Sequence, residues 1–204
     1  LSSSSAASDV YKRQTSSTAT TVSARPTPTF TAQPGATACS NTDVTYTTES
    51  GQSNYVWTVP GTLNTNYSIT SGGVGTTSNT VTLKWLTAGS KTVTINYTSN
   101  GCAAATATSS TATTVSAIPT PTFTAQPGAT ACASTDVTYT TQASQTNYIW
   151  TVPGTLNTDY TITSGGVGSS SNTVTLKWLT AGSKTVTINY TNSNGCTAAT
   201  ATSS

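Results

Sequence analysis

The stretch YVWTVPG, at residues 55–61, carries the pattern that decides the fold. Tyr55, Trp57 and Val59 stand at every second position, and a Pro-Gly pair ends the run. Such alternation places the large apolar side chains on one face of a β-strand, and Pro-Gly is a turn signal. Similar short alternating runs lie on both sides of this stretch, and no segment has the apolar period of a helix. The sequence therefore predicts an all-β protein.

The same stretch returns as YIWTVPG at residues 148–154, which is 93 positions later (148 minus 55). Cys39 and Cys132 are separated by the same interval, as are Trp85 and Trp178. One inserted residue, Ser193, makes the interval between Cys102 and Cys196 one position longer. The chain thus contains two copies of one module.

We place the first module at residues 25–117 and the second at residues 118–204. The segment SSTATTVSA at residues 16–24 recurs at residues 109–117, and one residue separates each copy from the PTP near the start of the next module. We interpret this segment as the last strand of a module. Residues 15–24 are then the last strand of a preceding, truncated repeat, and residues 118–204 end before their own last strand is complete. We expect a fragment of a longer array.

Residues 1–14 do not share the repeat pattern. Residues 9–14, DVYKRQ, match the in-frame translation of a transposon-end adapter used in sequencing libraries. We interpret the segment as a sequencing-adapter artefact, with a natural disordered Ser-rich tail as the alternative. It has no apolar stretch of the length that a secretion leader needs.

Within the first module, alternation and turn signals predict about seven strands, as in a β-sandwich. Each expected inner face carries bulky apolar residues at every second position, while Thr, Asn and Lys fall on the outer faces. The expected strands are residues 29–32, 43–48, 54–60, 67–70, 79–86, 91–98 and 103–115. The inner positions are Val44 and Tyr46; Tyr55, Trp57 and Val59; Val81, Leu83 and Trp85; and Val93, Ile95 and Tyr97.

The composition excludes several classes of function. Charged residues make up 6% of the chain, five residues are acidic and His is absent, so few groups could move a proton or hold a metal. We expect no enzyme, no cofactor and no metal site. The seven basic residues form no patch, which argues against nucleic-acid binding. No apolar stretch is long enough for membrane insertion.

Each module contains two cysteines, and three pairings of Cys39, Cys102, Cys132 and Cys196 are formally possible. Pairing within a module, Cys39 with Cys102 and Cys132 with Cys196, is favoured because the repeat preserves both positions. A loop of this size would stabilise a module by roughly 4 kcal/mol in the chain-entropy model. Disulfides persist in oxidising compartments, so we expect a secreted or cell-surface protein.

The two YxWTVPG stretches, the VTLKW runs at residues 81–85 and 174–178, and the NGC near each module's end resemble PKD-like domains. These are immunoglobulin-like β-sandwiches that occur as tandem repeats in large secreted or surface-anchored bacterial proteins, adhesins among them. The resemblance implies spacer, adhesion or carbohydrate-proximal roles and transfers no catalytic residue. The chain lacks the acidic WDFGDG motif of better-known PKD domains, so no metal or ligand role tied to those acids is carried over.

We therefore expect a non-catalytic structural spacer or stalk repeat of a large exported protein, whose partners are neighbouring repeats of the same chain. The alternative is an adhesion module that binds surface glycans or matrix proteins. Tyr67 and Tyr160 lie in Gly-rich, loop-like segments and are the aromatic residues most expected to be exposed for such contact. A third possibility is ice binding by the outward Thr ladders, although sandwich sheets twist. We assign Trp57, Trp85 and their counterparts to the core.

Overall fold

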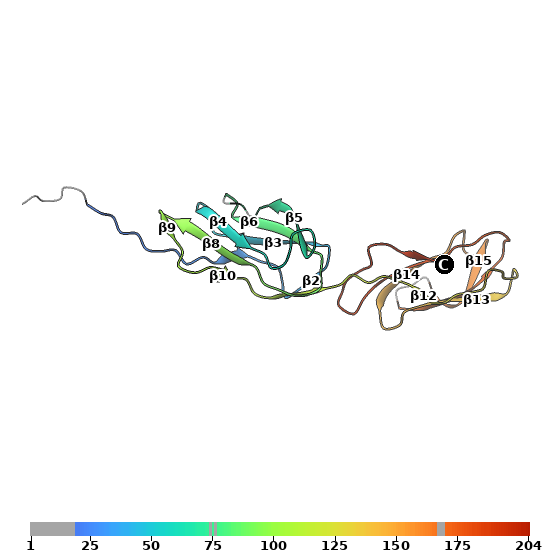
Figure 1. Ribbon diagram of the computed structural model, residues 1–204. Coiled ribbons are helices and arrows are strands. Elements are labelled where there is room, and N and C mark those ends of the chain that lie inside the picture. The colour runs from blue at the N-terminus through green and yellow to red at the C-terminus, as the bar shows by residue number, and fades with distance from the viewer. Residues whose placement is uncertain (1–18, 74, 76, 167–169) are drawn as a thin grey trace, which may run out of the picture.

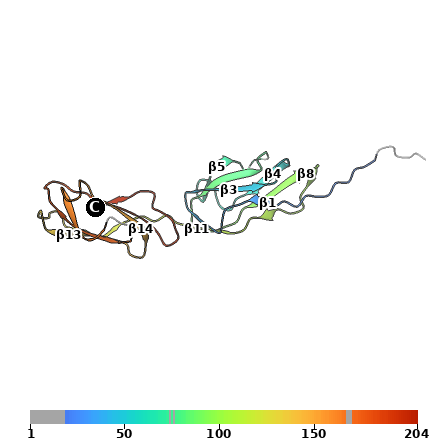
Figure 2. The same ribbon diagram turned by 180° about the vertical axis from the view of Figure 1, so that it is seen from behind.

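The computed structural model describes residues 19–73, 75, 77–166 and 170–204, so residues 1–14 lie outside the described part of the chain. Two all-β units follow one another along an extended molecule (Figure 1). The view from behind shows the same end-to-end arrangement (Figure 2). We call residues 25–117 repeat 1 and residues 118–204 repeat 2.

Repeat 1 begins with a four-stranded antiparallel sheet of order β1-β3-β6-β5. Its strands are β1 (Phe30–Ala32), β3 (Asp43–Thr48), β6 (Thr80–Trp85) and β5 (Tyr67–Gly72). A second sheet, of order β10-β8-β4, contains β10 (Thr108–Ser109), β8 (Thr94–Ser99) and β4 (Ser53–Thr58), and β9 (Cys102–Ala103) also pairs with β8. A third sheet consists of β2 (Thr37–Cys39), β11 (Thr113–Ser116) and β7 (Gly89–Lys91).

Repeat 2 has the same two main sheets. The first has the order β12-β13-β16-β15, with β12 (Phe123–Ala125), β13 (Asp136–Thr141), β16 (Thr173–Trp178) and β15 (Tyr160–Gly165). The second has the order β14-β17-β18, with β14 (Thr146–Thr151), β17 (Thr187–Thr191) and β18 (Thr202–Ser203). In the described part of repeat 2, no strands correspond to β2, β7 and β11.

The inner faces of each repeat form one hydrophobic core. Every inner position expected from alternation in repeat 1 is buried, and so is its counterpart in repeat 2. The structure thus confirms the all-β class and the two β-sandwich domains. The core is rich in aromatic residues, and Phe30 packs from the edge against Tyr46 and Trp57.

Three features differ from the expected strands. β2 was not expected, and the expected strand at residues 91–98 is divided between the end of β7 and most of β8. The segment at residues 103–115 was expected to be a single last strand, but it contains parts of three short strands, β9, β10 and β11. The segment changes neighbours: β9 and β10 pair with β8, whereas β11 lies between β2 and β7. This change of sheet prevents one continuous strand.

Candidate functional site

A disulfide joins the two repeats to each other. Cys39 at the end of β2 is bonded to Cys196 of repeat 2, with their Cα atoms 5.6 Å apart and 157 positions between them in sequence. Cys102 and Cys132 are free thiols; Cys132 is exposed and Cys102 is half-buried. The disulfide therefore lies at the joint between the repeats and not in the interior of either one.

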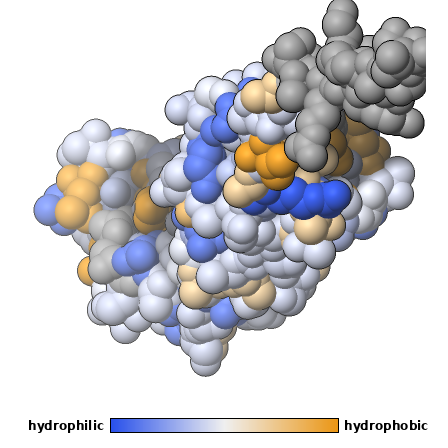
Figure 3. Space-filling view, turned by 90° about the vertical axis from the view of Figure 1, so that its left-hand side faces the viewer, coloured by the Kyte–Doolittle hydropathy of each residue, from blue (hydrophilic) through white to orange (hydrophobic). Residues whose placement is uncertain are grey.

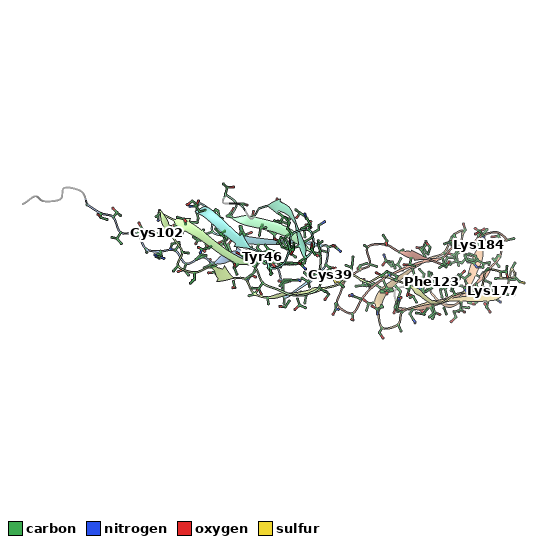
Figure 4. All side chains as sticks on the ribbon, viewed as in Figure 1. Cys39, Tyr46, Cys102, Phe123, Lys177 and Lys184 are labelled. Carbon is green, nitrogen blue, oxygen red and sulfur yellow. A yellow bond between two sulfur atoms is a disulfide. The ribbon has the colours of Figure 1, made fainter. Side chains whose placement is uncertain are left out.

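The expected pairing of Cys39 with Cys102 and of Cys132 with Cys196 is wrong. Six strands, β3 to β8, lie between Cys39 and Cys102. The five six-residue strands β3, β4, β5, β6 and β8 each cross the sandwich from end to end, and the three-residue β7 lies directly before β8 in the last of these crossings. An odd number of crossings places the two cysteines at opposite ends of repeat 1. Figure 4 shows Cys39 near the joint and Cys102 at the far end.

Strand β11 and the residues after it hold the joint together. β11 pairs in parallel with β2, and Ser116 stands opposite Cys39. The Ser40 amide donates to the Ser116 carbonyl at 2.8 Å, and the Ile118 amide donates to the Ser40 hydroxyl at 3.2 Å. From repeat 2, the Asn192 side-chain amide donates to the carbonyl of Ala117 at 3.0 Å. Residues 116–118, which we call the linker, thus form hydrogen bonds with both repeats.

Tyr67 and Tyr160, the expected exposed aromatic residues, are buried. Their exposed fractions are 8% and 7%. Each ring packs edge-on against a tryptophan of the neighbouring strand, with centroid distances of 6.1 Å to Trp85 and 6.0 Å to Trp178. Both tyrosines begin a strand whose first residue faces inward, so the expectation of exposure is wrong. Neither ring is available in this structure to stack on a sugar.

The tryptophans are core residues, as expected. The indole nitrogen of Trp57 donates to the carbonyl of Ser78 at 2.9 Å, and Trp150 makes the same bond to Ser171. Trp85 and Trp178 are buried as well, and Lys91 and Lys184 lie over their rings at 5.5 and 5.4 Å. These lysines cover the ring faces through cation–π contact.

The carboxylates are dispersed. Thr70 donates its hydroxyl to Asp43 at 2.8 Å, and Thr163 does the same to Asp136. Across the described residues, no group of three His, Cys, Asp or Glu side chains lies close enough to hold a metal ion. No helix within that same part of the chain could cross a membrane.

The outer face of the first sheet in each repeat carries the Thr ladder. The hydroxyls of Thr45 and Thr82 are 2.9 Å apart across β3 and β6, and those of Thr138 and Thr175 are paired at the same distance. Cross-strand Thr pairs of this kind stabilise a sheet. Part of the hydroxyl bonding capacity is therefore used within the protein.

Comparison with protein families gives a match over repeat 2. Residues 117–204 match the model described as PKD-like domain. Repeat 2 is a PKD-like domain. Repeat 1 has the same inner-face residues and the same strand order in its first sheet, so the PKD-like architecture is present twice. No curated protein matches the sequence.

Several solved structures match the chain at low sequence identity and low TM-score. The D0-D1 domain of intimin is 17% identical, with 87% of this chain and 98% of that chain covered and a TM-score of 0.31. Tandem Ig repeats of Dlar are 14% identical, with 86% and 95% covered and a TM-score of 0.31. The Escherichia coli adhesin FdeC is 17% identical, with 86% and 62% covered and a TM-score of 0.38. Similarity at this level carries no information about the function of the PKD-like repeats.

Sequence reasoning missed the joint because it treated each module as a closed unit. A usable signal was present: five expected strands separate Cys39 from Cys102, and an odd number of crossings leads to the opposite end of a sandwich. Counting crossings would have favoured pairing between neighbouring PKD-like repeats.

Proposed function

We propose that this segment is a non-catalytic spacer or stalk of an exported or cell-surface protein. The observation that carries the proposal is the Cys39–Cys196 bridge, which ties the start of repeat 1 to the end of repeat 2. Together with the hydrogen bonds of the linker, the bridge limits bending at the joint. Two repeats held end to end extend a protein more effectively than two repeats that fold back on each other.

The bridge also supports an extracellular location. A disulfide that fixes the relation of two domains is useful only where it stays oxidised, which is the case outside the cytosol. The surface fits a spacer as well. Seen along the molecule from the end that carries Cys102, the described surface is mostly of intermediate hydropathy, with apolar residues in small separate groups (Figure 3). Large exposed apolar patches are typical of binding surfaces, so the small separate groups on this face fit a spacer better than a binding module.

Small-angle X-ray scattering, combined with a glycan and matrix-protein array, tests the proposal. We expect an elongated particle whose maximum dimension is independent of concentration when Cys102 and Cys132 are blocked by alkylation, together with a silent array. The Cys39→Ser variant should give a broader distribution of dimensions because its joint bends. A compact native particle, or no difference between the native protein and the variant, would argue against the spacer.

Adhesion is the alternative outcome of the same experiment. A specific glycan or matrix-protein signal on the array would replace the spacer by an adhesion module. Because Tyr67 and Tyr160 are buried, such a signal would have to come from other residues, and Tyr67→Ala would reduce it only by unfolding repeat 1.

A further inference from the structure

Strand β11 fills a groove in repeat 1. It lies between β2, with which it pairs in parallel, and β7, with which it pairs antiparallel. Val115 is 2% exposed and belongs to the core of repeat 1, and Thr113 is fully buried. The Thr113 hydroxyl donates to Gly35 at 3.0 Å and the Thr114 amide to Ala36 at 2.8 Å. A four-residue strand thus closes one side of the sandwich.

The corresponding groove of repeat 2 is unfilled in this structure, because the residues that would match β11 fall after Ser204, the last residue of the sequence. Residues 130–132 and 182–184, the counterparts of β2 and β7, form no strands. Between them lies a hollow of about 280 Å³. Its lining includes the core residues Val137, Tyr139 and Trp178, together with Ala131, Gly182 and Lys184. We call this hollow the acceptor groove. Tyr139 and Trp178 are 5% and 6% exposed, whereas their counterparts Tyr46 and Trp85 in the filled groove are both at 0%.

The chain contains a second copy of the strand that fits this groove. Residues 20–23 read TTVS, as do residues 113–116 of β11. Residues 20–23 form no strand, and Val22 is 89% exposed although its counterpart Val115 is a core residue. An apolar β-branched side chain in open solvent thus corresponds to one that is buried at the joint.

The segment at residues 20–28 already lies on repeat 1 as residues 113–121 lie on repeat 2. The sulfur of Cys102 is 3.6 Å from the carbonyl oxygen of Ser23, and that of Cys196 is 3.9 Å from the carbonyl oxygen of Ser116. Thr108 donates its hydroxyl to Pro28 at 2.6 Å, as Thr202 does to Pro121. Cys102 therefore lies beside the segment that precedes repeat 1, just as Cys196 lies beside the segment that precedes repeat 2.

The observed joint between repeat 1 and repeat 2 serves as a template for joining residues 20–23 of one copy to the acceptor groove of another copy. A strand at residues 20–23 that enters an acceptor groove would run beside residues 130–132, as β11 runs beside β2. Ser23 would then stand opposite Cys132, as Ser116 stands opposite Cys39. Because Cys102 lies against Ser23, the free thiols of Cys102 and Cys132 would meet as Cys196 and Cys39 do.

We propose that copies of this chain associate head to tail: residues 20–23 of one copy fill the acceptor groove of another copy, and Cys102 of the first copy then forms a disulfide with Cys132 of the second. The two thiols lose two protons and two electrons as the S–S bond forms. A small-molecule disulfide such as oxidised glutathione accepts them and leaves as two thiols. The partner is a repeat of the same kind, and the proposal does not depend on the spacer role.

The test is oxidation of the full chain in a glutathione redox buffer over a range of protein concentrations, followed by non-reducing electrophoresis. We expect a ladder of covalent oligomers that collapses to monomer on reduction. Chymotryptic cleavage after Phe123 and Tyr139 separates the two free cysteines, so mass spectrometry should find Cys102 linked to Cys132. Only monomer at every concentration, or Cys102–Cys102 and Cys132–Cys132 links in equal amounts, would overturn the proposal.

Variants separate the strand from the thiols. Cys102→Ser and Cys132→Ser should each abolish the ladder alone, whereas a mixture of the two variants should stop at a covalent dimer. Val22→Asp keeps all thiols and alters an exposed side chain, so it should fold normally and slow oligomer formation at least about tenfold, because a charge would enter an apolar groove. Val22→Thr is the matched control and should keep the ladder.

A free peptide with the sequence of residues 16–24 provides an independent readout. It should compete for the acceptor groove and suppress the ladder in proportion to its concentration, while a peptide with Asp at the position of Val22 should not. A ladder that is insensitive to both the peptide and Val22→Asp would show random oxidation of accessible thiols and would contradict strand exchange.

Discussion

Two buried tyrosine hydroxyls in repeat 1 differ in their hydrogen bonds. The Tyr55 hydroxyl donates to the Glu49 carbonyl at 2.8 Å and accepts from the Gln52 amide at 2.9 Å. The Tyr46 hydroxyl is buried, and among the described residues no group forms a hydrogen bond of normal geometry with it. Burial raises its pKa, and the nearby Trp85 and Thr113 side chains offset only part of that rise. A buried polar group costs free energy when it lacks a partner, whereas removal of a bonded group leaves its partners unsatisfied.

Tyr55→Phe should therefore lower the free energy of unfolding by about 1–2 kcal/mol. Tyr46→Phe should leave it unchanged or raise it. Both changes remove one oxygen from a buried ring, so each is the control for the other. Chemical denaturation of the two variants makes the comparison, and a larger loss for Tyr46→Phe than for Tyr55→Phe would contradict it.

Glu49 gives repeat 1 an acid-sensitive contact whose counterpart in repeat 2 is neutral. Partial burial alone would raise the pKa of this carboxyl, but hydrogen bonds from Thr29 and Thr48 lower it to about 2 from 4.5. A pKa lowered on folding stabilises the folded state above the unfolded pKa, and the benefit is lost as pH falls. Repeat 2 has the neutral Gln142 here, bonded to Thr122 and Thr141.

We expect the melting temperature to fall as pH drops from about 5 to about 2, and Glu49→Gln to flatten that fall. The reverse substitution, Gln142→Glu, should introduce the same dependence into repeat 2. Thermal unfolding across this pH range measures both effects. An unchanged profile in Glu49→Gln would mean that other carboxyls set the acid sensitivity.

At the residue scale, alternation was sufficient to assign the core. Tyr55, Trp57 and Val59 face inward because side chains alternate along a strand, and no other information was needed. Tyr67 could not be assigned in this way. It is the first residue of β5, where the preceding residues show no alternation, and its burial depends on contact with Trp85 from another strand.

At the scale of the strand, Gly72 allows β5 and β6 to pair closely. It has a φ of +68°, and a Cβ atom added there would lie 2.2 Å from the carbonyl oxygen of Thr80. Gly51 has a similar φ of +75° but open space around the added atom. Both positions disfavour L residues, but only Gly72 combines that strain with a backbone clash.

Gly72→Ala should lower the free energy of unfolding by more than Gly51→Ala, which should cost about 1 kcal/mol from backbone strain alone. The difference between the two variants measures the clash with β6. Denaturation curves for both provide the comparison, supported by amide exchange in β5 and β6. Equal losses would show that the backbone moves aside at Gly72 without cost.

The positions of most strands could be predicted from the sequence. Which strands pair with one another was harder to predict. The segment at residues 43–48 was assigned with the bounds of β3, because apolar alternation and the preceding turn signals coincide there. The neighbours of β11 were not assigned, since Thr, Ala and Ser fit any sheet edge. The sequence therefore indicated that a strand was present at residues 113–116 without showing that it closes the side of repeat 1.

Across the whole molecule, the Cys39–Cys196 bridge closes a loop that contains nearly all of both repeats. Replacing both cysteines by serine should destabilise the protein by up to about 5 kcal/mol in the chain-entropy model, because the unfolded chain gains freedom. The matched control is the double variant Cys102→Ser, Cys132→Ser, which removes no bond within the chain. Thermal unfolding of the two variants should show a marked loss only in the first.

The same bridge determines how the molecule responds to pulling. Tension applied at the two ends passes from Cys39 to Cys196 through the sulfur atoms, so the 157-position segment between them carries none of it. Without the bridge, that segment could lengthen to roughly 500 Å at about 3.3 Å per residue. With it, tension reaches only the residues outside this segment, and the segment itself is stretched only after the covalent bond breaks.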